Sequence, residues 1–269
     1  MRMSKSLREN MHNLNAIITI AFRDITKLLS DRSRILASLI FPIIFIGVLG
    51  TSLQQNIGQN LSYDFLTFVF TGVIAQTLFQ SVASGIISIV EDRQNDFAQE
   101  MFIAPISRYS ILLGKILGEM IVALIQLTGI MLFGLIIGIH IDWVALLRTV
   151  PFFIVAAYFG GSFGVLVMAN LADQRAANQI FPFLIFPQFF LAGVFNPVRF
   201  LPLPILIASR LSPMTYAVDL IRSIYYAGSP EYAAVVLFNP AINLAIALGV
   251  GTLFLVIGTY IFVKNERDR

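Results

Sequence analysis

The sequence predicts an all-α membrane protein that crosses the bilayer six times. Hydrophobic residues make up 57% of the 269 residues and charged residues only 12%, and the mean hydropathy is +0.82. A water-soluble domain carries roughly 25% charged residues, so this chain has too little polar surface to face water on all sides. Because a membrane-spanning helix needs about 20 apolar residues, we expect spans at residues 35–53, 64–90, 109–139, 148–171, 176–195 and 241–263.

Residues 1–34 precede this six-helix domain of residues 35–269 and predict an amphipathic connecting helix. Apolar residues recur at spacings of three and four from Leu14 to Leu29, and polar residues fill the other face. Phe22 belongs to the apolar face, whereas Arg23 and Lys27 lie on the basic one. This pattern suits a helix lying in the membrane interface. A soluble helix packed on a partner is the alternative.

The distribution of Lys and Arg predicts the orientation of the chain. Of the 18 basic residues, 14 fall on the side that holds both termini and residues 91–108. The other four are Arg148, Arg199, Arg210 and Arg222. Loops rich in Lys and Arg stay in the cytoplasm. We therefore expect a multi-pass protein of the cell (inner or plasma) membrane with both termini cytoplasmic.

The connecting segment at 91–108, EDRQNDFAQEMFIAPISR, predicts a short amphipathic cytoplasmic helix between the second and third spans. Its apolar and acidic residues fall on opposite faces. Pro105 prevents its continuation, and Ser107 can cap the next span. A simple interfacial linker helix is the alternative. The side chains that we expect to contact another protein are Asp96, Phe97, Glu100, Met101, Phe102 and Arg108.

The segment at 196–230, between the fifth and sixth spans, contains five prolines, too many for one continuous helix. Its apolar stretches predict short re-entrant helices that enter the outer leaflet and return to the same side. One of these should begin at Ser212 and Pro213, an N-cap followed by a proline in the first turn, and end near Tyr226. On that helix Asp219 and Arg222 are spaced to pair.

Neutral polar side chains, rather than charged ones, occupy the middle of the predicted spans. They either form hydrogen bonds between helices or line a substrate path. These residues are Gln76, Gln80, Gln126 and Gln188. Lys115 and Glu119, four residues apart near the cytoplasmic end of the third span, are expected to pair or to reach toward the membrane surface.

Motifs for catalysis and metal binding are missing from the sequence. There is no GxxxxGK[ST], HExxH or GxSxG, and no cysteine, so we expect no catalytic residue and no metal site in this chain. The net charge of +3 is too small to suggest a nucleic-acid partner. A lipid-modifying enzyme is disfavoured by these absences. A secondary transporter or channel is disfavoured by the scarcity of ionisable groups at mid-depth.

Two stretches resemble the type 2 ABC exporter permease family. EDRQNDFAQEMFIAPISRYSILLGK resembles the cytoplasmic coupling segment of those proteins, with its proline followed by Ser, Arg and LLGK. FLAGVFNPVRFLPLPILIASRLSPMTYAVDLIR resembles their late region. The amphipathic stretch before the first span resembles their N-terminal connecting helix, so the resemblance covers nearly the whole chain.

The resemblance implies the membrane subunit of an ATP-binding-cassette exporter of the drug or lipid type. Two copies, or one copy and a sister permease, would bind two cytoplasmic ATPase subunits, which would hold ATP and Mg²⁺; this chain would hold no cofactor itself. The cargo would be an amphipathic or hydrophobic molecule, such as a drug-like compound, a lipid or a lipid-linked glycan. An ion-gradient-driven secondary transporter or a channel is the alternative function.

Overall fold

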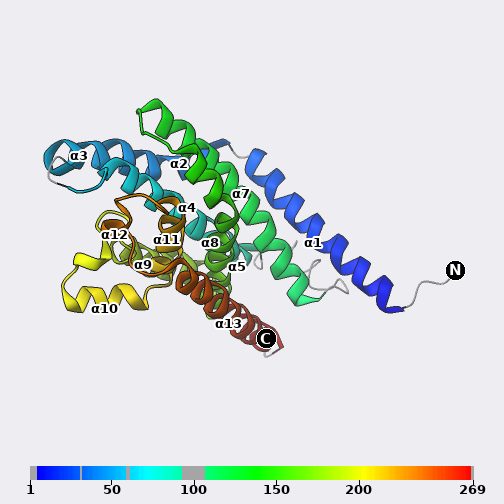
Figure 1. Ribbon diagram of the computed structural model, residues 1–269. Helices are drawn as coiled ribbons and strands as arrows, with labels where there is room; N and C mark the ends of the chain where they lie inside the picture. The colour runs from blue at the N-terminus through cyan, green and yellow to red at the C-terminus, as the bar shows by residue number, and fades with distance from the viewer. Residues whose placement is uncertain (1–4, 31, 59–60, 93–106, 268–269) are drawn as a thin grey trace.

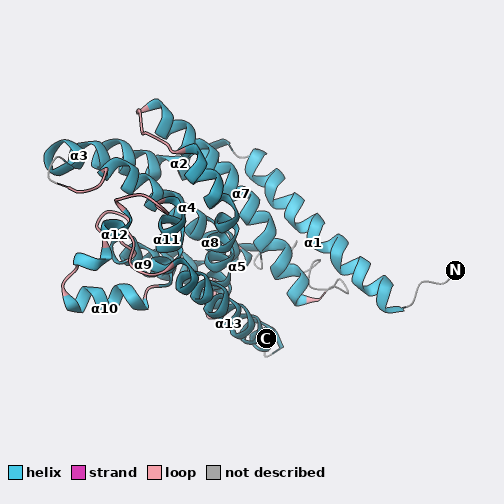
Figure 2. Ribbon diagram, in the orientation of Figure 1, coloured by secondary structure: helices cyan, strands magenta, loops and turns pink. Residues whose placement is uncertain are grey.

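The computed structural model describes residues 5–30, 32–58, 61–92 and 107–267 (Figure 1). Within these ranges the chain forms helices joined by short connections, and no strand occurs (Figure 2). The all-α prediction is therefore confirmed. The helix expected at 91–108 lies mostly outside the described residues, as do Asp96, Phe97, Glu100, Met101 and Phe102.

The helices follow the predicted order along the chain. They are α1 (Lys5–Ser30), α2 (Arg32–Ile44), the π-helix η1 (Phe45–Gly50), α3 (Thr51–Ile57), α4 (Phe65–Ile87), α5 (Ile89–Asp92), α7 (Arg108–Ile136), α8 (Trp143–Ala169), α9 (Gln174–Leu191), the 3₁₀ helix η3 (Val198–Phe200), α10 (Leu203–Leu211), α11 (Pro213–Tyr225), α12 (Tyr232–Val235) and α13 (Pro240–Arg267).

Among the described residues, five helical stretches are long and apolar enough to cross a membrane. They are Ser38–Asn56, Phe65–Ile87, Tyr109–Ile136, Trp143–Ala169 and Tyr232–Asn265. The predicted fifth span, at 176–195, corresponds to α9, which is not among them. Two prolines, Pro182 and Pro187, and a polar first turn make α9 less apolar than the other spans. The count of six spans therefore stays a prediction.

Side-chain caps fix where four of the helices begin. Asp64, Ser107, Asp142 and Asp173 precede α4, α7, α8 and α9. Each accepts a hydrogen bond from a backbone amide two or three residues later, at 2.7–3.1 Å. Such caps satisfy amides that the first helical turn leaves without a partner. The predicted capping role of Ser107 is confirmed.

Helix α4 is the centre of the bundle, packed against α8, α7 and α11. Its close contact with α8 depends on two glycines of α8. A Cβ atom at Gly160 would lie 2.1 Å from the Phe79 carbonyl oxygen, and one at Gly164 would lie 2.7 Å from that of Ala83. Small residues spaced four apart allow such close approach of two helices in a membrane. Helix α13 packs on the far side of α8.

Helix α1 lies along α7, as Figure 1 shows. Two glycines of α7 make the contact close, since a Cβ atom at Gly114 would be 3.0 Å from the Cα of Ile17, and one at Gly118 would be 2.9 Å from that of Ala21. The apolar side chains of Ile18 and Phe22 point away from this contact and are 58% and 69% exposed. Helix α1 therefore has a face buried on α7 and an exposed apolar face, beside its polar one.

The segment at 196–230 folds into short helices, as its prolines predict. The helix expected from Pro213 to about Tyr226 is confirmed as α11, which ends at Tyr225 and has Pro213 in its first turn. In Figure 1, α10 and α12 lie at the left of the molecule, and both marked chain ends lie to their right.

Candidate functional site

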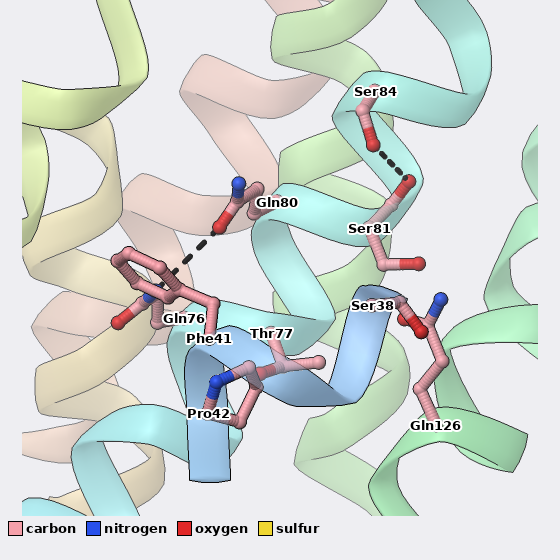
Figure 3. Close-up of a pocket in the computed structure, with 9 residues that line it drawn as sticks. All are labelled: Ser38, Phe41, Pro42, Gln76, Thr77, Gln80, Ser81, Ser84 and Gln126. Atoms are coloured by element: carbon pink, nitrogen blue, oxygen red, sulfur yellow. Dashed lines mark hydrogen bonds between the residues drawn. The ribbon is translucent and has the colours of Figure 1, made fainter. Parts of the chain in front are cut away.

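A polar pocket of about 340 Å³ lies between α2, α4 and α7 (Figure 3). We call it the glutamine pocket. Its lining residues are Ser38, Phe41, Pro42, Gln76, Thr77, Gln80, Ser81, Ser84 and Gln126. Seven of these nine carry an amide or a hydroxyl, and none is charged. The structure thus brings three of the four predicted mid-depth glutamines together around one cavity.

Several polar groups of the glutamine pocket have hydrogen-bonding capacity that the protein leaves unused. The Oε1 atom of Gln76 is buried and accepts no hydrogen bond from the described residues. Its amide nitrogen reaches the Oε1 of Gln80 only at 3.5 Å, the outer limit for such a bond. Since buried polar groups are nearly always satisfied, groups left open around a cavity indicate a place for a ligand or water.

The α2 wall of the glutamine pocket is built around Pro42. A proline inside a helix cannot donate to the carbonyl four residues earlier, here that of Ser38, and the helix changes to the π form at Phe45. Such changes accompany breaks in the helical hydrogen-bond ladder. Phe41 is held by ring contacts with Phe45, at 4.1 Å between centroids, and with Phe189, at 5.3 Å. It offers the pocket a fixed aromatic surface.

The fourth predicted glutamine, Gln188, does not line this pocket. Its Oε1 accepts hydrogen bonds from the Ser212 hydroxyl at 3.1 Å and the Met214 amide at 3.3 Å, while its Nε2 donates to the Leu184 carbonyl at 2.9 Å. Gln188 therefore caps the start of α11. Ser212 holds the predicted N-cap position, but its side chain makes no capping bond of its own.

A buried group of charges, which we call the ion junction, joins α1 to α7. The Lys115 ammonium lies 3.0 Å from an Asp24 carboxylate oxygen and 3.4 Å from one of Glu119. All three side chains are 2–5% exposed. The predicted pairing of Lys115 with Glu119 is thus confirmed, and the structure adds Asp24, which the sequence analysis did not identify as a partner.

The ion junction also touches α4. A Cβ atom at Gly85 would lie 2.1–2.3 Å from the Glu119 side chain, so Glu119 packs directly against the backbone of α4 at this glycine. Gly85 is two residues before the end of α4, and α7 begins at Arg108. The junction therefore links α1 to the end of α4, which precedes the segment at 91–108, and to the start of α7, which follows it.

On the opposite side of the bundle, Arg222 of α11 joins three segments through backbone carbonyls. Its guanidinium donates to Gly193 at 2.6 Å, Phe68 at 2.9 Å and Val194 at 3.0 Å. It also lies over the Phe68 ring, 3.5 Å from the centroid, a distance suited to cation–π attraction. Burial lowers the pKa of Arg222 to about 10, so the group remains charged at neutral pH.

Asp219 does not form the ion pair with Arg222 that the sequence spacing suggests. It accepts hydrogen bonds from the amides of Leu237 and Phe238, at 2.7 and 2.8 Å, and from the Asn243 side chain at 2.7 Å. Burial raises the pKa of the Asp219 carboxyl, and these hydrogen bonds oppose that rise. The Asp219 carboxylate therefore binds the backbone amides of Leu237 and Phe238 instead of Arg222, whose guanidinium donates to three backbone carbonyls. We call Gln188, Asp219 and Arg222 the outer cluster.

The remaining predicted residues lie on α1 and at the start of α7. Phe22 is on the exposed apolar face of α1, with Arg23 and Lys27 on the same helix. Arg108 is the first residue of α7. Phe22, Arg23 and Lys27 do not line the glutamine pocket.

Sequence analysis did not identify the hydroxyls of the glutamine pocket. Thr77, Ser81 and Ser84 repeat along α4 at spacings of four and three, beside Gln76 and Gln80. Residues at these spacings share one face of a helix. A polar stripe on an otherwise apolar span was thus the available signal.

A bundle of apolar helices with an uncharged polar cavity among them is typical of membrane transport proteins. The chain belongs to the ABC-2 type transporter family, whose model matches residues 15–226. The family membership expected from the coupling and late segments is thereby confirmed. Proteins of this family are transport permeases, the membrane subunits of ABC transporters.

Three relatives show what kinds of protein the chain is similar to. A putative transport permease, ycf38, from Cyanophora paradoxa is 25% identical over 86% of this chain and 81% of its own length. Nodulation protein J from Rhizobium leguminosarum bv. viciae is 23% identical over 83% and 82%. A probable multidrug ABC transporter permease, YbhR, from Escherichia coli strain K12 is 25% identical over 62% of this chain and 45% of its own length.

Proposed function

We propose that this chain is the permease subunit of an ATP-driven exporter that moves an amphipathic or hydrophobic molecule outward. Two copies, or one copy and a sister permease, form the membrane part, and two cytoplasmic ATPase subunits bind ATP and Mg²⁺. Both termini are cytoplasmic in this proposal, and the protein lies in the inner or plasma membrane. Family membership supports the ATP-driven class.

The observation that carries the proposal is the glutamine pocket. It opens among spans that are otherwise apolar, and the buried Oε1 of Gln76 on its wall accepts no hydrogen bond from the described residues. With the termini in the cytoplasm, the pocket occupies the middle and the cytoplasmic half of α4, where a cargo from the cytoplasm or the inner leaflet would enter. Gln76, Gln80 and Gln126 are the substrate-path residues of this proposal. Gln188 affects the substrate path only indirectly, by holding the start of α11 in place.

Coupling to the ATPase is assigned to the segment at 91–108 and to α1. A permease responds to its ATPase only through contacts that differ between the two ATPase states. We assign those contacts to Asp96, Phe97, Glu100, Met101, Phe102 and Arg108. The α1 residues Phe22, Arg23 and Lys27 face lipid or the motor at the membrane surface. The ion junction supports this assignment, because it ties α1 to α7 and α4.

The proposal is tested by co-expressing the chain with the P-loop ATPase encoded nearest to its gene and reconstituting the pair into liposomes. We expect a stable complex whose ATP hydrolysis exceeds that of the ATPase alone. A triple variant, Phe97→Ala with Glu100→Ala and Met101→Ala, should lose this stimulation. Arg175→Ala serves as the control, because Arg175 is exposed in the first turn of α9, outside the coupling segment.

Each result of this experiment bears on a particular part of the proposal. A triple variant that binds the ATPase and is fully stimulated removes the coupling role of the segment. Transport that follows an ion gradient and ignores ATP identifies the chain as a secondary transporter or channel instead.

A further inference from the structure

We infer that the glutamine pocket binds an uncharged, hydroxyl-rich head group, namely a short glycan carried on a lipid. This inference rests on the proposed transport function and gives its cargo a chemical class. The evidence comes from the hydrogen-bonding groups of the pocket, its lack of charge, its size and its aromatic wall.

The open hydrogen-bonding groups of the pocket include both donors and acceptors. Gln126 makes no side-chain hydrogen bond with the described residues, so both atoms of its amide are available. The Gln80 amide nitrogen and the buried Gln76 Oε1 are available as well. Sugar hydroxyls both donate and accept, so they can satisfy such a mixed set. A purely apolar cargo would leave these groups buried without partners, at about 1–3 kcal/mol each.

Among the residues whose side chains the structure describes, no charged one lines the pocket, which argues against an ionic head group. A buried charge without a counter-charge is strongly unfavourable. Glu119 is the carboxylate closest along α7 to Gln126, but it lies against Gly85 and is engaged with Lys115. Neither a cationic drug nor an anionic lipid head group would therefore find compensation in the pocket.

The size and shape of the pocket suit the head of a larger molecule. Ligand pockets typically measure about 300–1,000 Å³, and this one, at about 340 Å³, is at the small end. Phe41 gives it a flat apolar surface on which the C–H face of a sugar ring can lie. The opposite face of α2 exposes Leu36, Ile40 and Ile44, which suits an alkyl chain that stays among lipid while the head group enters.

The test uses three photoactivatable amphiphiles that share one alkyl chain and differ in head group: maltose, trimethylammonium and sulfate. Each is crosslinked to the full chain in lipid nanodiscs, and the modified residues are mapped by mass spectrometry. We expect the maltoside to label α2, α4 and α7 around the pocket at least tenfold more than the two charged probes. Excess unlabelled maltoside should suppress this labelling.

Variants separate a binding role from a structural one. Gln76→Leu together with Gln126→Leu should reduce maltoside labelling at least tenfold. Gln179→Leu, which changes an exposed glutamine of α9 outside the pocket, should leave it unchanged. Gln126→Glu should shift preference toward the trimethylammonium probe, which a merely structural glutamine would not do.

Labelling of the pocket by a charged probe as strongly as by the maltoside would overturn the inference, as would maltoside labelling that survives the double leucine variant. These outcomes are distinct from failure of the proposed function, because crosslinking needs no ATPase. If the chain fails to couple to ATP hydrolysis but keeps its maltoside preference, the proposed ATP-driven export is wrong and the pocket assignment holds.

Discussion

The outer cluster and the glutamine pocket both place glutamine amides among apolar helices, but they use them in opposite ways. In the outer cluster, Gln188 has both of its amide atoms hydrogen-bonded within the protein. In the pocket, Gln126 has neither atom bonded to a described residue, and Gln76 has a buried oxygen without a donor. Burial alone does not separate the two, since all three side chains are 2–8% exposed.

The difference teaches how a structural polar group is distinguished from a binding one inside a membrane bundle. Where no water is available, a polar group must find its partner in the protein or in a ligand. The outer cluster is satisfied internally and holds backbone segments in place. The pocket is left open to satisfy something else. Substitutions in the outer cluster should therefore affect folding, and those in the pocket should affect cargo.

Replacing Arg222 should have the largest effect on folding. Arg222→Leu removes three hydrogen bonds from a charged donor, each contributing about 1.5–3 kcal/mol. We expect the protein to lose most of its folded yield, measured by size-exclusion profile and thermal unfolding in detergent. Arg210→Leu is the matched control, because Arg210 is exposed and lies 5.7 Å from the Phe238 ring. If the two variants give the same folded yield and the same thermal stability, the outer cluster does not have the structural role assigned to it.

The ion junction should rank next. Lys115→Met leaves the buried Asp24 carboxylate without its cation, and breaking a buried pair in this way costs about 3–5 kcal/mol. Adding Asp24→Asn to that variant should recover part of the loss, which a double-mutant cycle measures. Lys264→Met, an exposed lysine of α13, should unfold like the parent protein. If Asp24→Asn brings no recovery, Asp24 and Lys115 are not energetically coupled.

A glycine contact between α4 and α8 should give a smaller loss. Gly160→Ala places a methyl group 2.1 Å from the Phe79 carbonyl oxygen, and such overpacking typically costs about 1–3 kcal/mol. Gly249→Ala is the control, since nothing lies within 4 Å of its Cβ position and alanine favours a helix by up to about 1 kcal/mol. The measurement is the unfolding midpoint. A Gly160→Ala protein as stable as Gly249→Ala would mean that α4 and α8 separate without cost.

Sequence reasoning succeeded where the cause of structure is local. The apolar runs predicted the helices at α4, α7, α8 and α13, and Ser107 and Pro213 marked helix starts that the structure confirms. Helix α9 is the exception among the spans, because its two prolines and polar first turn weaken the apolar pattern.

Sequence reasoning failed where the partners are distant along the chain. Lys115 and Asp24 are separated by 91 positions, and Arg222 and Phe68 by 154. The spacing of Asp219 and Arg222 on one helix suggested a pair, but each finds better partners on other segments. For the same reason the four mid-depth glutamines were indistinguishable in sequence: whether a glutamine is satisfied depends on which helix packs opposite it.

The glutamines themselves provide the finest test of the comparison. Gln126→Leu removes an amide that bonds to no described residue, so the free energy of unfolding should change by no more than about 0.5 kcal/mol, the range typical of substitutions that break no buried network. Gln188→Leu removes the acceptor at the start of α11, and loss of a helix cap costs about 0.5–2 kcal/mol. Both are measured by thermal unfolding in the same detergent. Should Gln126→Leu prove the more damaging of the two, Gln126 is satisfied inside the protein, and the pocket loses the open amide on which its assignment to a ligand depends.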